Sequence, residues 1–258
     1  TLTGTRGAVD LVAREARLYD IDATMGADHL RAASGTIAEN RTLRLTGVQA
    51  TLAGETSLQA ASATYRDGNV TASGGVRVRS SDGTLTAGSA TASRGGDITA
   101  SGRVRLQRGS LWASGDRLTA DRRLTRATLR PMRAGGTSSE SAWSLSAGSG
   151  SFAKGEGISL ESASGVFRGG GRRAEGHAGR AKLSADGQTV TLSDGLRLSS
   201  SSDNLTVTAQ SGTYLPAEKV FRLTGNVHAE VRGAKVTGKT WIYRLGRGDD
   251  EPVVETGR

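Results

Sequence analysis

The sequence predicts an all-β, antiparallel fold in which a bent sheet forms two facing layers. Three observations predict it. Apolar and polar residues alternate along short segments, Asp-Gly and Gly-Gly pairs recur between the segments, and a glycine recurs in the middle of alternate segments. Alternation with a period of two is typical of strands that are buried on one face.

The composition agrees with a thin structure. The chain has 258 residues, of which 35% are hydrophobic and 4% aromatic, and it contains 37 glycines. Ordinary globular chains are nearer half apolar, so a thick aromatic core is not expected. A two-layer β structure whose strands are apolar on one face only reconciles low hydrophobicity with regular patterning.

A repeat of about 25 residues, with two strands in each unit, runs along the chain. Clear copies begin at residues 57 and 84. In the second strand of the copy at residue 57, Val76 and Val78 alternate with Arg77 and Arg79. Residues 9–18 are compatible with a short amphipathic helix or a strand, and their match to the later units favours a strand.

Turns and bends are marked by different glycines. Asp-Gly and Gly-Gly pairs tolerate the positive φ of tight hairpins. They predict hairpin turns at Asp67-Gly68, Asp82-Gly83, Gly95-Gly96, Asp186-Gly187 and Asp194-Gly195. Gly47, Gly74, Gly102 and Gly225 lie inside strands, where glycine usually marks a bulge or bend. A bend repeated at the same place in successive strands folds the sheet along a line and encloses an apolar seam.

Residues 131–141 are turn-rich and lack strand periodicity, and the pattern restarts at Trp143. We therefore predict one β module at residues 1–133, a second at 142–246 and a mobile tail at 247–258. One continuous sheet is the alternative, because the connecting segment is too short to decide between them.

The most specific pattern lies near the end of the chain. Ala209 is followed by Tyr214, residues 223–227 read Leu-Thr-Gly-Asn-Val, and Gly238 is followed by Tyr243. This pattern resembles the OstA-like lipopolysaccharide-transport family, which comprises LptA, LptC and the periplasmic domain of LptD. Residues 57–78 and 143–167 are more similar to the LptC version.

The resemblance implies an open β-jellyroll of V-shaped cross-section in the periplasm, whose apolar interior carries lipid acyl chains. It implies two kinds of partner: lipopolysaccharide or a similar lipid, and other OstA-like jellyroll proteins that join end to end by strand-edge pairing. A homo-oligomer is a further alternative. At about twice the length of a typical single module, the chain departs from the family.

The predicted lipid-binding residues share the apolar faces of the last strands. These groove residues are Leu205, Val207, Tyr214, Phe221, Leu223, Val227, Val231, Val236, Trp241 and Tyr243. The alternative is that they form a dry seam between two layers. Arg168, Arg172 and Arg173 make the densest basic patch, which would contact an anionic headgroup or would be an arginine-bearing loop.

No catalytic, metal or cofactor site is predicted. His29, His177 and His228 are scattered singly, without a carboxylate or second histidine at ligand spacing. The sequence contains no nucleophile elbow, phosphate loop or dinucleotide fingerprint, and no cysteine. No stretch approaches the length of about 18 apolar residues that predicts a membrane-spanning helix.

The net charge of +9 allows an anionic partner. Nucleic acid is not predicted, because the basic residues lack interleaved aromatic side chains for base stacking. We therefore expect a non-enzymatic periplasmic protein that binds and transfers a lipopolysaccharide-type lipid between the inner and outer membranes. The alternative is a structural or adhesive envelope protein with a closed core.

Overall fold

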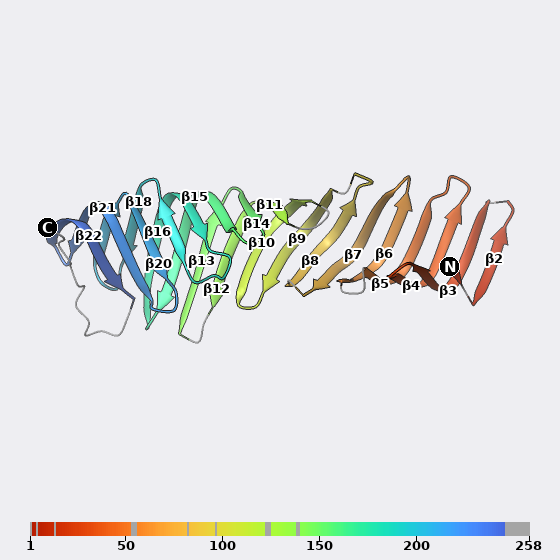
Figure 1. The fold of residues 1–258 in the computed structure, drawn as a ribbon, viewed down its shortest axis with the longest axis horizontal. Helices are drawn as coiled ribbons and strands as arrows, with labels where there is room; N and C mark the ends of the chain where they lie inside the picture. Colours follow the sequence, from red (N-terminus) through yellow and green to blue (C-terminus); the bar gives the residue numbers. More distant parts are fainter. Residues whose placement is uncertain are drawn as a thin grey trace. The chain divides into compact units, whose positions relative to one another are not determined.

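A computed structural model describes residues 2–3, 5–12, 14–52, 56–81, 83–95, 97–121, 125–137 and 140–245. The predicted tail at residues 247–258 lies outside the described residues. Strands and the turns between them account for the regular structure, and their pairing is antiparallel (Figure 1). The predicted all-β fold is confirmed. In the described part of the chain, no helix has the length and apolar character needed to cross a membrane.

The chain forms two compact units. The first unit contains Thr1–Gly109 and Ser114–Leu124, and the second contains Ser110–Ala113 and Thr125–Arg258. The strands of the first unit are β1 (Leu2–Thr3), β2 (Arg6–Asp10), β3 (Glu15–Met25), β4 (Asp28–Ala38), β5 (Leu43–Leu52), β6 (Thr56–Arg66), β7 (Asn69–Ser80), β8 (Gly83–Ala92), β9 (Ile98–Arg108) and most of β10 (Leu111–Ala120).

The second unit begins with shorter strands and ends with two long ones. Its strands are β11 (Arg126–Arg130), β12 (Met132–Thr137), β13 (Ser141–Ala147), β14 (Gly150–Ala153), β15 (Gly157–Gly169), β16 (Arg172–Leu183), β17 (Val190–Ser193), β18 (Leu196–Ser200), β19 (Leu205–Ala209), β20 (Ser211–Leu215), β21 (Val220–Val231) and β22 (Ala234–Arg244).

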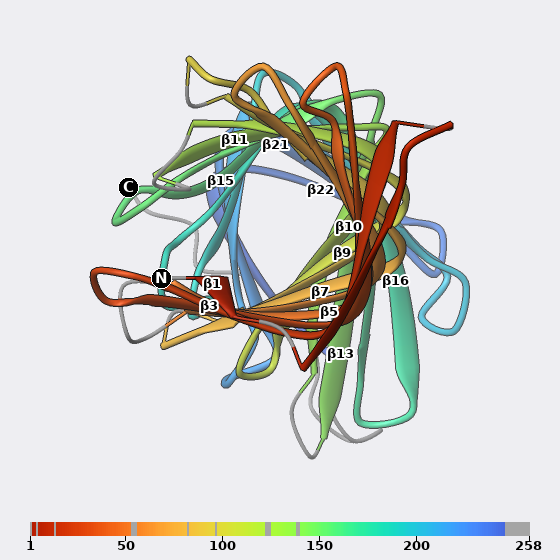
Figure 2. The same ribbon diagram turned by 90° about the vertical axis from the view of Figure 1, so that its right-hand side faces the viewer.

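The predicted bend glycines of the first unit lie on alternate strands, β5, β7 and β9, and have the left-handed conformation. Gly47, Gly74 and Gly102 have φ of 62°, 79° and 77°, and the pairing register shifts at Gly74 and at Gly102. A Cβ on Gly74 would lie 2.5 Å from the Cβ of Ala61 on the neighbouring strand. Figure 2 looks across the strands and shows those of the first unit, from red to yellow, curving from one layer into the other.

Each bend divides its strand into two arms. In the first unit we call the half of the sheet that contains Tyr65 the Tyr65 arm, and the half that contains Leu58 the Leu58 arm. Apolar residues of both arms and of the bend form a buried cluster of Ile21, Ala32, Leu45, Val48 and Ala63, with Leu18, Leu30, Leu43 and Leu58 partly buried against it. The inner faces of both arms are therefore apolar.

The predicted hairpin turns have mixed outcomes. Asp67-Gly68 joins β6 to β7, and Gly187 lies in the turn between β16 and β17, so both predictions are confirmed. Asp194-Gly195 is not a hairpin turn, because β17 and β18 on either side of it both pair with β16. This pair is a bend instead. A left-handed Asp-Gly pair suits either role, which explains the wrong prediction.

Two further segments differ in detail from the predictions. The described residues of 9–18, which are 9–12 and 14–18, contain no helix; they include the end of β2 and the start of β3, which pair with each other. The turn-rich interpretation of residues 131–141 is wrong for β12, which pairs with β13. Small residues hide the alternation of β12 in the sequence, and a Cβ on Gly135 would lie 2.6 Å from the indole of Trp112.

Candidate functional site

The second unit has an aromatic interior. We call the half of its sheet that contains Phe167 the Phe167 arm and the half that contains Tyr214 the Tyr214 arm. The ring of Phe167 lies 4.8 Å from that of Tyr214 and 4.9 Å from that of Phe221. Tyr214, Phe221 and Tyr243 are directly paired across three strands. Ring contacts between the two arms therefore fill the interior.

Polar contacts also join the two arms at the mouth, by which we mean the arm ends away from the bend. The hydroxyl of Tyr243, from the Tyr214 arm, donates to Asp203, in the turn that ends the Phe167 arm. Asp203 also accepts from Arg172 at 2.8 Å and from Ser200 at 3.0 Å. We call the contacts of Tyr243, Asp203 and Arg172 the mouth latch.

A second set of contacts crosses the same mouth. The Ser141 hydroxyl donates to the carbonyl oxygen of Pro216 at 3.1 Å, and Lys219 forms an ion pair with Glu140. The second unit is therefore closed at its mouth as well as filled inside.

Most predicted groove residues lie in this closed interior. Eight of the ten are buried: Leu205, Val207, Tyr214, Phe221, Leu223, Val227, Trp241 and Tyr243. Val231 and Val236 are half-buried. Sequence reasoning omitted Phe167, which is fully buried and joins the arms. The sequence gave no signal for this contact, because alternation shows which face of a strand a residue lies on but not which residues of the other arm it meets.

Two of the three arginines of the predicted basic patch form ion pairs with carboxylates of the protein. Arg172 is in the mouth latch, with 19% of its side chain exposed, and its partner Asp203 is 12% exposed. Arg173 pairs with Glu175 at 2.6 Å on the surface. Arg168 is exposed and lies directly opposite Arg173 on the neighbouring strand. Of the three predicted arginines, Arg168 and Arg173 are therefore the two with exposed side chains.

The first unit differs because its inner face is incompletely covered. Directly paired apolar residues cross six strands of the Tyr65 arm near the mouth, a row that we call the mouth row: Ile37, Leu43, Tyr65, Val70, Ala92 and Ile98. Ile37, Tyr65 and Val70 are 37%, 47% and 39% exposed.

The Leu58 arm carries a matching apolar row. It consists of Leu30, Ala50, Leu58, Val78, Leu85 and Leu106, each paired with the next. Leu58 and Val78 are half-buried, and no aromatic contact like that of Phe167 is found among the described residues of this unit. The first unit thus presents two apolar faces that remain accessible, and sequence reasoning did not select any of these residues.

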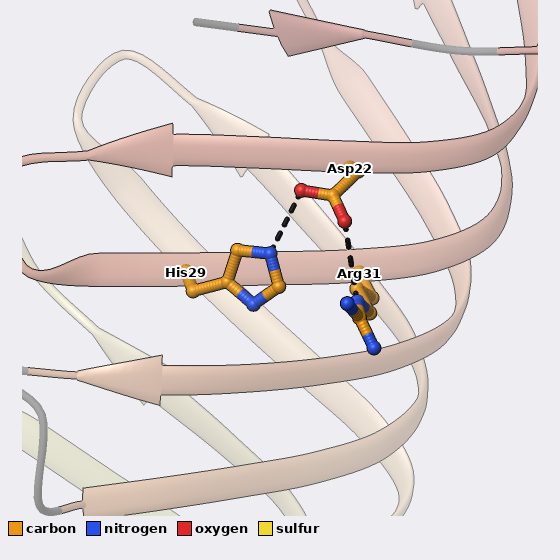
Figure 3. Close-up of polar contacts among 3 residues, drawn as sticks. All are labelled: Asp22, His29 and Arg31. Carbon is orange, nitrogen blue, oxygen red and sulfur yellow. Dashed lines mark hydrogen bonds and ion pairs between the residues drawn. The ribbon is translucent and has the colours of Figure 1, made fainter.

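One polar cluster lies on the outer face of the Leu58 arm (Figure 3). The Nε2 atom of His29 is 2.7 Å from Oδ1 of Asp22, and Nε of Arg31 donates to Oδ2 of Asp22 at 3.2 Å. The hydrogen bond from His29 lowers the pKa of Asp22, as does that from Arg31. Asp22 is not at metal-ligand spacing from His29 in the sequence, and strand pairing brings these residues, seven apart, within hydrogen-bond distance.

This cluster contains only one histidine and one carboxylate. Among the described residues there is no group of three or more histidine, cysteine, aspartate or glutamate side chains that could hold a metal ion. The ion pairs described above lie on outer faces or at the mouth, and the inner faces are lined mainly by apolar side chains.

Bent antiparallel sheets with apolar inner faces define the class of this protein as an open β-jellyroll. Residues 55–248, about three quarters of the chain, match the family described as LptA/(LptD N-terminal domain) LPS transport protein. The chain belongs to this family, whose members are lipopolysaccharide-transport components, and the predicted OstA-like membership is confirmed.

Other comparisons are more distant. The solved structure of LptH from Pseudomonas aeruginosa, the LptA-homologous periplasmic component of its lipopolysaccharide transport device, is 12% identical, with a TM-score of 0.23. The alignment covers 47% of this chain and 75% of LptH. Comparison with curated proteins gave no match.

Proposed function

We propose that this protein binds the acyl chains of a lipopolysaccharide-type lipid on the inner face of its first unit. It acts in the periplasm, as a transport component that passes the lipid between the inner and outer membranes. The observation that carries this proposal is the mouth row, in which Ile37, Tyr65 and Val70 lie on the apolar inner face and remain more than one third exposed.

The binding energy comes from apolar burial. Each acyl methylene that leaves water contributes about 0.8 kcal/mol, and the mouth row and the Leu58 arm offer two continuous apolar surfaces. Exposed apolar patches of this kind mark ligand or interaction sites in proteins. The second unit, with its filled interior, would accept a chain only after its arms separate.

The free edges of strands β2 and β22 support assembly with related proteins. In the described part of the chain, β2 pairs only with β3, and β22 pairs only with β21. An unpaired strand edge is a template for another strand. Val9, Leu11 and Val12, at and after β2, are strongly exposed. We propose that these edges pair with other jellyroll proteins of the transport system.

Arg168 and Arg173 are the proposed contacts for an anionic headgroup. Both side chains face outward on adjacent strands, and two guanidinium groups at this spacing would favour a phosphate. Arg172 is left out of this proposal because its ion pair with Asp203 is mostly buried, whereas the ion pair of Arg173 with Glu175 is half-exposed.

Photo-crosslinking tests the proposal. A photoreactive amino acid placed at Tyr65 should crosslink to lipid A, whereas the same group at Thr64 should not, because Thr64 lies on the other face of the same strand. Equal crosslinking at both positions, or none at Tyr65, would contradict lipid binding and favour the alternative of a structural envelope protein with a closed core.

A further inference from the structure

Two hydrogen-bond donors in the interior of the second unit are unsatisfied. The hydroxyl of Tyr214 and the indole N–H of Trp241 belong to side chains that are 0% and 1% exposed. Neither group has a hydrogen-bond partner among the described residues. A buried donor without an acceptor is costly and rare in native proteins, so each such group requires an explanation.

Both donors face the same apolar interior. Tyr214 is paired with Phe221, and Phe221 is paired with Tyr243. Trp241 lies two residues before Tyr243 and therefore on the same face of β22. The rings of Phe167 and Phe221 lie 4.8 and 4.5 Å from that of Tyr214. These neighbours are hydrocarbon and offer no acceptor.

Tyr243 is a buried tyrosine of the same unit whose hydroxyl does have a hydrogen-bond partner. This hydroxyl donates to Asp203 in the mouth latch. The missing partner of Tyr214 is therefore specific to its position in the interior and is not shared by every buried tyrosine of this unit.

We propose that Tyr214 and Trp241 donate hydrogen bonds to the carbonyl oxygen of an ester- or amide-linked acyl chain that enters the second unit. The inference rests on the proposed function and adds a second, polar point of recognition to it. An acyl chain matches the apolar rings, and its linking carbonyl supplies an acceptor without bringing a new donor. Tyr214 and Trp241 carry the only buried side-chain nitrogen or oxygen atoms without a partner in this interior, among the described residues.

Entry of the chain has a defined structural requirement. The Phe167 arm and the Tyr214 arm must separate, which breaks the ring contacts of Phe167 and the bond from Tyr243 to Asp203. The acyl chain then takes the place of the ring contacts, and its carbonyl oxygen supplies the acceptor that the Tyr214 hydroxyl lacks.

Infrared spectroscopy of the full chain with lipid A carrying ¹³C-labelled ester carbonyls tests the proposal. A carbonyl that accepts a hydrogen bond absorbs at lower frequency, so we expect a shifted band with the wild type and its loss with Tyr214→Phe. Loss of one hydrogen bond should weaken lipid A binding by about three- to tenfold.

The lipid-free variants supply a matched control. Tyr214→Phe should raise the thermal midpoint, because it removes an unsatisfied group, whereas Tyr243→Phe should lower it, because it removes a bond to Asp203. A Tyr214→Phe variant that lowers the midpoint, or that leaves the carbonyl band or the affinity unchanged, would overturn the proposal.

Crosslinking from Tyr65 separates the two proposals. If lipid A crosslinks at Tyr65 while its carbonyl band is unshifted, the inference about Tyr214 fails and the proposed function stands. If lipid A neither crosslinks at Tyr65 nor shows a shifted band, the proposed function fails as well.

Discussion

At the scale of single residues, two tyrosines on inner faces have opposite surroundings. Tyr65 is 47% exposed in the mouth row of the first unit, whereas Tyr214 is enclosed by Phe167 and Phe221 in the second. Their sequence contexts are similar, since both end a strand of alternating residues. What differs is the presence of a large ring on the opposite arm, and this difference decides which tyrosine is accessible while the arms remain packed together.

Burial of Tyr214 predicts loss of stability in alkali. Burial raises the pKa of Tyr214 to about 12, and burial with the hydrogen bond to Asp203 raises the pKa of Tyr243 further. The unfolded state loses these protons first, near pH 10. Stability is therefore complete below about pH 10 and falls as the pH rises toward 12.

Circular dichroism against pH should show this alkaline unfolding, and Tyr214→Phe should move its midpoint to higher pH. Tyr65→Phe, at a half-exposed position, is the control. An alkaline midpoint that is the same in the wild type and in Tyr214→Phe would contradict the assignment.

The mouth latch predicts unequal effects for two ion pairs. Asp203→Ala leaves Arg172 partly buried without its partner and should cost about 2–4 kcal/mol of unfolding free energy. Glu175→Ala breaks the surface pair with Arg173 and should cost less than about 1 kcal/mol. Denaturant unfolding measures both. Equal costs would show that the latch does not hold the arms together.

At the scale of strands, the bends define the two arms. Gly74 and Gly75 are adjacent residues with φ of 79° and 85°, but only Gly74 lies against a neighbouring strand. Gly88 and Gly102 likewise approach each other across β8 and β9, where an added Cβ on Gly102 would lie 3.3 Å from the Cα of Gly88. Close approach of neighbouring strands therefore accompanies the left-handed conformation at the bend.

Substitutions at this pair of glycines separate the two requirements. Gly75→Ala should cost about 1–2 kcal/mol, because it places a Cβ in a left-handed conformation. Gly74→Ala should cost about 1–3 kcal/mol more, because its Cβ also meets Ala61. Denaturant unfolding of both variants measures the difference. Equal costs would mean that close packing at the bend contributes nothing.

Strand pattern and bends could be predicted from the sequence because both depend on local chemistry. Val76 and Val78 alternate with Arg77 and Arg79, and the glycine at position 74 marks the bend beside them. Asp194-Gly195 could not be assigned correctly, since the same conformation serves a hairpin or a bulge. Contacts between arms, such as that of Phe167 with Tyr214, depend on the bend angle and have no local signal.

At the scale of the whole molecule, both units have a bent sheet with apolar inner faces, but the accessibility of the interior differs between them. The first has an accessible apolar inner face, and the second has an interior closed by aromatic rings and the mouth latch. The sequence led to the second unit as the lipid site because its family motif and its aromatic residues are there. Alternation and motif identified the inner faces, whereas accessibility is set by packing between arms and appears only in three dimensions.

We predict that lipid binding depends on the mouth row of the first unit, and the affinity for lipid A of two variants tests this most directly. Val70→Glu places a charge on the inner face and should weaken lipid A binding at least about tenfold, because the carboxylate would be desolvated against acyl chains. Thr71→Glu places the same charge on the outer face of the same strand and should leave the affinity within about twofold of the wild type. Equal affinities for both variants, with both proteins folded, would contradict acyl-chain binding by the first unit.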